Sequence, residues 1–247
     1  NQRIKLLTMK YIFASCDEKY FVEHGVQFIN SAINQGVLPW VDIINPDNNL
    51  VLVSGKAVKP LNLLRMLHDD DKYKITYTKS DITDRTFYAC NRFLKASEIL
   101  QTADEVLITD IDCFLRKPIE WEYFQDCDYS LYLRDPLPGT VGWEKEGTRV
   151  GAGAVYLRNT ALTFITLVKN QIEHYRSYNL SGLQWFVDQV SLWEIHKHFQ
   201  TNEVKLRFRE MPFRYIDWEF TEEGIIWTGK GARKTQQNYL EERDRAS

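Results

Sequence analysis

Two aspartates separated by one residue follow an apolar run near the middle of the chain, as Asp110-Ile111-Asp112. The run, Val106-Leu107-Ile108, has the composition of a short strand that is buried on both faces. Carboxylates at the end of such a strand are costly to bury without a positive partner, and hard divalent cations prefer carboxylate and phosphate oxygens. The pair therefore indicates a Mn²⁺ or Mg²⁺ site that holds a diphosphate. The alternative is a pair of solvated aspartates in a loop.

A basic segment rich in glycine lies near the end of the chain, as Gly229-Lys230-Gly231-Ala232-Arg233-Lys234. Its flexible backbone and the cations Lys230, Arg233 and Lys234 are suited to phosphate charge. The spacing and the position differ from those of a Walker phosphate-binding loop. The alternative is a basic turn on the surface.

Two further groups of residues could face a ligand. Gly151 and Gly153 lack side chains, which either lets a ligand approach the backbone or lets a helix pack closely on a sheet. Asp188 and Gln189 are polar within an apolar helical run, so they either point at a reacting centre or form a polar helix edge. The five histidines are isolated or two residues apart, and we expect surface or hydrogen-bonded side chains rather than metal ligands.

The first half of the chain alternates between strand and helix patterns. Strands are expected at 10–17, 40–46, 74–78 and in the run before Asp110, with helices at 24–36, 60–67 and 84–100, the last capped by Asp84. A short strand or loop is expected at 51–53. This alternation predicts an α/β fold with a mostly parallel sheet flanked by helices. Ligands bind beyond the carboxyl ends of such strands, where Ser15 and Asp17 also lie.

The second half predicts strands at 129–133, 150–157, 204–208 and 225–227. Helices are expected from 159 to about 178, capped by Asn159, and from 181 onward. The segment 135–148 contains prolines and three glycines and is expected to be a loop. The charged residues after Gln236 are expected to form a solvated helix or a frayed end.

Composition narrows the class of protein. The 247 residues, 44% hydrophobic and 26% charged, suit one large soluble α/β domain. A formal net charge of -3 argues against a nucleic-acid partner bound by bulk charge. No apolar run approaches the ~18 residues of a transmembrane helix, and no signal-peptide pattern is present. The four cysteines lack metal or CxxC spacing, which indicates buried free thiols and a cytoplasmic location.

The order of these motifs over roughly residues 10 to 235 resembles the GT-A class of nucleotide-sugar glycosyltransferases, most closely the family 8 type that includes glycogenin and bacterial lipopolysaccharide galactosyltransferases. The segments that carry the resemblance are Ala14-Ser15-Cys16-Asp17, the helix with Tyr88 and Arg92, the strand ending Asp110-Ile111-Asp112, Val150 to Leu157, Asp188-Gln189, and Ile225 to Lys230.

The resemblance implies a single Rossmann-like GT-A domain over 1–247. It would comprise a nucleotide-binding half at 10–115, a smaller acceptor-side half at 116–235 and a charged tail at 236–247. It also implies a metal-dependent transfer, with retention, from a UDP-linked sugar to a saccharide or glycoconjugate acceptor.

The resemblance also implies roles for individual residues. Asp110 would contact the ribose and the Mn²⁺ or Mg²⁺, and Asp112 would bind the metal. Ser15 and Asp17 would lie near the base, and Arg92 near the donor. Lys230 with Gly229 would hold the diphosphate. Asp188 and Gln189 would lie by the transferred sugar, with Asp188 the first candidate nucleophile.

Two positions depart from the family pattern. Gly151 stands where the family has an asparagine that contacts the sugar, and Ile226 stands where it has a metal-binding histidine. The third protein ligand is therefore absent or comes from another residue. This difference keeps open a non-catalytic sugar- or nucleotide-binding module on a degenerate transferase fold.

A haloacid-dehalogenase-like phosphatase with Asp110 as nucleophile is a further alternative. Phe114 stands where that motif usually has Thr or Val, and the motif normally opens its domain, whereas about a hundred residues and three strands precede it in this chain.

Overall fold

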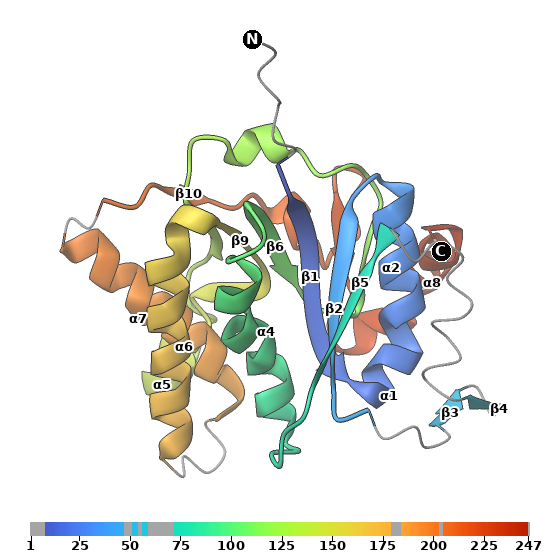
Figure 1. The fold of residues 1–247 in the computed structure, drawn as a ribbon, viewed down its shortest axis with the longest axis horizontal. Helices are drawn as coiled ribbons and strands as arrows, with labels where there is room; N and C mark the ends of the chain where they lie inside the picture. The colour runs from blue at the N-terminus through green and yellow to red at the C-terminus, as the bar shows by residue number, and fades with distance from the viewer. Residues whose placement is uncertain are drawn as a thin grey trace.

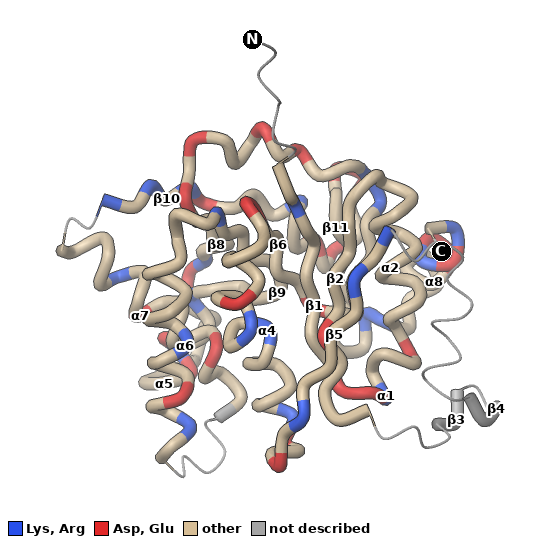
Figure 2. Tube along the Cα trace, viewed as in Figure 1, with Lys and Arg blue, Asp and Glu red and all other residues tan. Residues whose placement is uncertain are grey.

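The fold is given by a computed structural model, which describes residues 8–46, 51–53, 56–58, 72–178, 184–202 and 205–246. The helix expected at 60–67 lies outside these residues, as does the start of the helix expected from 181. Basic and acidic residues are interspersed over the described elements (Figure 2), in keeping with the small net charge of -3.

A seven-stranded mixed sheet forms the centre of the molecule (Figure 1), in the order β10-β8-β9-β6-β1-β2-β5. The strands are β1 (Lys10–Asp17), β2 (Leu38–Ile44), β5 (Lys74–Thr78), β6 (Glu105–Thr109), β8 (Tyr129–Leu133), β9 (Val150–Arg158) and β10 (Phe208–Glu210). The neighbours β5, β2, β1 and β6 are parallel, whereas β9 is antiparallel to both β6 and β8. The predicted α/β fold with a mostly parallel sheet is confirmed.

Helices cover both faces of this sheet (Figure 1). On one face, α4 (Arg85–Ile99), α6 (Leu162–Ser177) and α7 (Val187–Thr201) share a core with Phe13 and Ile108. On the other, α2 (Val26–Asn34) packs on Ile12 and Leu107. Successive residues of β1 and β6 thus face opposite cores, which explains why both strands read as continuous apolar runs.

Smaller elements complete the described fold. Before α2 lie α1 (Glu18–Tyr20) and a π-helical turn, η1 (Phe21–Gly25). β7 (Cys113–Leu115) pairs with β11 (Ile226–Thr228), and β3 (Val51–Val53) pairs with β4 (Lys56–Val58). The 3₁₀ turns are η3 (Trp121–Phe124), η4 (Asn159–Ala161), η5 (Gln184–Phe186), η6 (Phe213–Tyr215) and η7 (Gly231–Thr235). The four cysteines are buried and free, as predicted.

The segment 135–148, expected to be a loop, contains the helix α5 (Gly142–Gly147). Tertiary contacts stabilise this short helix. Trp193 of α7 donates to Glu146 over 2.6 Å, and the Trp143 ring meets Tyr175 of α6 with centroids 4.6 Å apart. These partners are distant in sequence, so a local pattern of glycines and prolines did not reveal the helix.

Two expected boundaries were also wrong. Asn159 does not cap α6; it begins η4 and donates its side-chain amide to Asp104 over 3.3 Å, and α6 starts at Leu162. The strand expected at 204–208 is β10 at Phe208–Glu210, and just before it the backbone amide of Arg207 donates to the side chain of Asp128.

The helix expected after Gln236 is confirmed as α8 (Gln237–Ala246), and most of its residues are exposed or half-buried. It is not solvated on all sides, because Tyr239 is 2% exposed and packs against Phe114 and Phe220. The Tyr239 hydroxyl donates to the carbonyl of Asp112 over 2.9 Å. The C-terminal helix therefore helps to fix the backbone of the aspartate motif.

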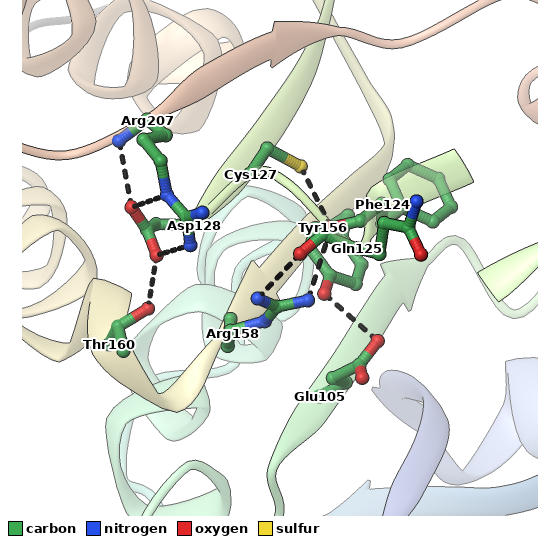
Figure 3. Close-up of polar contacts among 9 residues, drawn as sticks. All are labelled: Glu105, Phe124, Gln125, Cys127, Asp128, Tyr156, Arg158, Thr160 and Arg207. Carbon is green, nitrogen blue, oxygen red and sulfur yellow. Dashed lines mark hydrogen bonds and ion pairs between the residues drawn. The ribbon is translucent and has the colours of Figure 1, made fainter. Parts of the chain in front are cut away.

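Asp128, just before β8, binds Thr160 and Arg207, the residue just before β10 (Figure 3). It accepts from the Arg207 backbone amide at 2.8 Å, from the Arg207 guanidinium at 3.1 and 3.2 Å, and from Thr160 at 2.6 Å. Burial alone would raise the pKa of Asp128, but the hydrogen bonds from Arg207 and Thr160 outweigh it and lower the pKa to about 2.

This low pKa predicts a contribution to acid sensitivity. Because the folded pKa lies below the unfolded value of about 4, the contribution of Asp128 to stability is present above pH 4 and is lost as the pH falls toward 2. The Asp128→Asn variant should therefore lose less unfolding free energy than wild type between about pH 5 and 2 in urea titrations. The exposed neighbour Asp126 gives the control Asp126→Asn, and equal slopes for wild type and Asp128→Asn would refute the assignment.

Candidate functional site

A cavity of about 810 Å³ lies beyond the carboxyl ends of β1 and β6. β2 and β5 lie on one side of β1 in the sheet, and β6, which follows them in the sequence, lies on the other side of β1. In open α/β sheets, ligands bind at this reversal of strand order. The volume falls in the range of small-molecule sites, roughly 300–1,000 Å³. The position and size of the cavity both indicate a ligand-binding site.

Most of the residues predicted for the site line this one cavity. They are Ser15, Asp17, Arg92, Asp110, Asp112, Gly153, Asp188, Gln189, Gly229 and Lys230. Gly151 and Arg233 do not line it. A Cβ on Gly151 would lie 2.8 Å from Cδ1 of Tyr132 and 3.0 Å from Cδ1 of Ile216, so the glycine serves close packing. Arg233 is exposed on η7.

Arg92 is the central charge of the site. It projects from α4, is 6% exposed, and contacts Asp110 through Nη1 and Asp188 through Nη2, the latter over 3.2 Å. Burial alone would lower the pKa of Arg92, but the two carboxylates hold it above its usual value. One guanidinium thus joins α4, the end of β6 and the start of α7.

Asp112 is fixed through its backbone and paired through its side chain. Its carbonyl accepts from the Gly229 amide at 3.1 Å and from Tyr239 at 2.9 Å. Its carboxylate pairs with Lys234 of η7. Burial and the charge of Asp110 raise the pKa of Asp112, and Lys234 opposes that rise.

Asp188 and Gln189 are held at the first turn of α7. Asp188 accepts from Arg92 and, over 2.8 Å, from the Gln189 amide; burial raises the pKa of Asp188 against the attraction of Arg92. With its side-chain amide oriented to donate, the Gln189 nitrogen lies 2.7 Å from the Val150 carbonyl and 3.2 Å from that of Gly147. Gln189 therefore also anchors the start of β9 at the cavity wall.

Gly153 makes room for the aspartate motif. A Cβ on this residue of β9 would lie 2.9 Å from Oδ2 of Asp110, and the Ile216 side chain blocks the other direction at 3.1 Å. Gly153 thus acts by admitting a protein carboxylate to the cavity, a role that the sequence pattern did not distinguish from approach by a ligand.

The two residues predicted to lie near a base have structural partners as well. Ser15 accepts from Asn91 at 2.7 Å and lies 3.4 Å from the buried carboxylate of Asp42. Asp42 also accepts from Thr76 and Thr78. Asp17 caps α1 by accepting from the Tyr20 amide at 2.8 Å. Both residues line the cavity at the end of β1, and contact with a base stays a prediction.

The cavity also contains residues that sequence reasoning left out of the site. They include Lys19, Tyr20, Arg85, Tyr88 and Trp185. Of the three cations expected to meet phosphate charge, Lys230 and Lys234 line the cavity and Arg233 does not. Neighbours on a 3₁₀ turn point about 120° apart, so only one of Arg233 and Lys234 can face the cavity. Trp185 is 55% exposed at the wall, and its closeness in sequence to Asp188 was the available signal.

The side chains present allow a restricted kind of metal site. Within the described residues, no group of three His, Cys, Asp or Glu side chains is arranged to hold a metal ion. Ile226, at the family histidine position, is fully buried on β11 opposite Leu115. Asp110 and Asp112 do both line the cavity. Mg²⁺ commonly binds through one or two carboxylates plus substrate phosphates and water, so the donor set fits a metal shared with a diphosphate.

Comparison with known proteins adds no assignment: neither the models of known protein families nor the sequences of curated proteins match this chain. In the described part of the chain, no helix has the length and hydrophobicity needed to cross a bilayer. The case for a function therefore depends on the cavity and its residues.

The Arg92→Met variant tests the central ion pairs. It leaves the buried carboxylate of Asp188 and the partly exposed carboxylate of Asp110 without their shared cation, so the free energy of unfolding in urea should fall by about 3–5 kcal/mol, chiefly through Asp188. Arg85→Met removes an exposed arginine of the same cavity wall and should change the free energy of unfolding by less than about 0.5 kcal/mol. Equal effects of the two substitutions would contradict the role given to Arg92.

Proposed function

We propose that this chain is a metal-dependent glycosyltransferase, with a GT-A version of the Rossmann-like fold. It would move a sugar from a nucleoside-diphosphate sugar, UDP-linked, to a saccharide or glycoconjugate acceptor. The observation that carries this proposal is the meeting of Asp110 and Asp112 with Arg92, Lys230 and Lys234 in one cavity at the reversal of strand order. Such a set of charges suits a diphosphate bound together with a divalent cation.

Lys230 is suited to the diphosphate. Among the described residues, no carboxylate lies within ion-pair distance of it, and its Nζ lies 4.5 Å from the centre of the Trp218 ring. Burial lowers the pKa of Lys230, while Asp110 opposes that change. A half-buried ammonium without a carboxylate partner gains most from an incoming anion. Lys230 would therefore neutralise charge on the diphosphate leaving group as the bond to the sugar breaks.

Asp110 and Asp112 would hold Mn²⁺ or Mg²⁺, which when bound supplies Lewis-acid stabilisation of the leaving diphosphate. Asp188 is the candidate to face the transferred sugar. Both of its oxygens accept hydrogen bonds, from Arg92 and from the Gln189 amide, so its orientation is fixed before a donor enters. A fixed carboxylate can stabilise positive charge that develops on the sugar ring, or attack it in a transfer with retention.

A second candidate, a binding module without catalysis, is favoured by one observation. Both motif aspartates already have cation partners from the chain, and the described residues supply no third metal ligand. Such a site could bind a nucleotide without promoting transfer. Turnover separates the two candidates.

Incubation with a panel of UDP-sugars and Mn²⁺ tests the proposal. Wild type should release UDP, and Asp112→Asn should lower the rate by about 10²–10³-fold because one ligand of the charge-stabilising site is weakened. Asp126→Asn, an exposed substitution outside the cavity lining, should retain the wild-type rate.

The other outcomes assign the alternatives. Calorimetric binding of UDP with Mn²⁺ but no UDP release would favour the binding module. Release of phosphate from a phosphomonoester, without action on UDP-sugars, would favour the phosphatase. Absence of any UDP binding, unchanged by Asp112→Asn, would refute the glycosyltransferase.

A further inference from the structure

Lys234 forms an ion pair with a carboxylate of the aspartate motif, that of Asp112. Its Nζ pairs with Oδ2 of Asp112, donates to the Tyr20 hydroxyl over 3.1 Å, and lies 5.0 Å from the centre of the Tyr20 ring. All three residues line the cavity. A cation of the protein thus engages an oxygen that the proposed function gives to a metal.

The surroundings hold Asp112 more firmly than the head of Lys234. The Asp112 backbone is fixed by Gly229 and Tyr239, and its side chain is 13% exposed against 26% for Lys234. Lys234 belongs to η7, which begins at Gly231 with a φ of +54°. When a competing cation enters, the long lysine head can therefore swing away while the carboxylate stays in place.

Charge balance decides when that exchange is favourable. The carboxylates of Asp110, Asp112 and Asp188 face the cations of Arg92, Lys230 and Lys234, so this group is already close to neutral. A divalent cation entering alone would displace Lys234 and leave it without an anion. A diphosphate entering with the metal brings about two negative charges and gives Lys234 a new partner.

We propose that Lys234 exchanges Asp112 for the diphosphate as the metal enters, so that metal and nucleotide bind strongly only together. This inference rests on the proposed nucleotide-diphosphate site and adds a donor-binding residue with a defined coupling role. By linkage, each ligand must strengthen the other by the same factor. A coupling of about 10–100-fold is the size expected when one ion pair is traded for another.

Calorimetry with Mn²⁺ and UDP tests the exchange without any need for turnover. In wild type, Mn²⁺ alone should bind weakly, and saturating UDP should tighten Mn²⁺ binding by about 10–100-fold. Lys234→Met frees Asp112, so Mn²⁺ alone should bind at least about tenfold more tightly, and UDP should tighten it by less than about threefold.

Two variants control for charge and folding. Arg233→Met removes the neighbouring exposed cation, which does not line the cavity, and should retain the wild-type coupling. Lys234→Arg keeps a cation that can pair with Asp112 and should also retain most of the coupling. Urea unfolding establishes whether each variant is folded. If Lys234→Met does not fold, Lys234→Arg is compared with wild type in its place.

The possible failures are distinguishable. If wild type and Lys234→Met bind Mn²⁺ alone equally and show the same coupling to UDP, the exchange is wrong while the nucleotide site stands. If Lys234→Arg loses the coupling although it is folded, the exchange is likewise wrong. If wild type binds no UDP with or without Mn²⁺, the exchange and the proposed function both fail.

Discussion

The structure of the site depends on one buried guanidinium. Arg92 of α4 joins two elements that follow it at different distances in the sequence: Asp110 at the end of β6 is 18 residues away, and Asp188 at the start of α7 is 96 residues away. Burying this charge is costly unless both carboxylates meet it, so the position of each element constrains the other two. The cavity exists at this place because parallel strands end there and because Arg92 holds Asp110 and Asp188 on its wall.

Much of the fold could be predicted from local patterns. Strands buried on both faces are apolar throughout, so β1 and β6 could be predicted from their continuous apolar runs. Asp84 caps α4, as its position before the helical pattern predicted. The location of the site followed from the same pattern. Carboxyl ends of parallel strands meet at one edge, so Ser15, Asp17 and Asp110 had to lie near one another.

The remaining features depend on partners that are distant in sequence. Whether Lys234 or Arg233 faces the cavity is decided by the phase of η7 against Asp112. The role of Gly151 is decided by Tyr132 and Ile216, and α5 and α8 are stabilised by contacts with other helices and with the core. A single sequence shows the charge and size of the side chain at each position, but it does not show which distant side chain will contact it in the fold.

The central claim is that this cavity binds a nucleoside diphosphate through the aspartate motif and the lysines of the C-terminal loop. A crystal structure of the chain with UDP and Mn²⁺ tests it most directly. The account predicts the diphosphate beside Asp110 and Asp112, with Lys230 and Lys234 in contact with its oxygens. A nucleotide bound elsewhere, or one bound in this cavity with Lys234 still paired to Asp112 and no metal beside the aspartates, would contradict it.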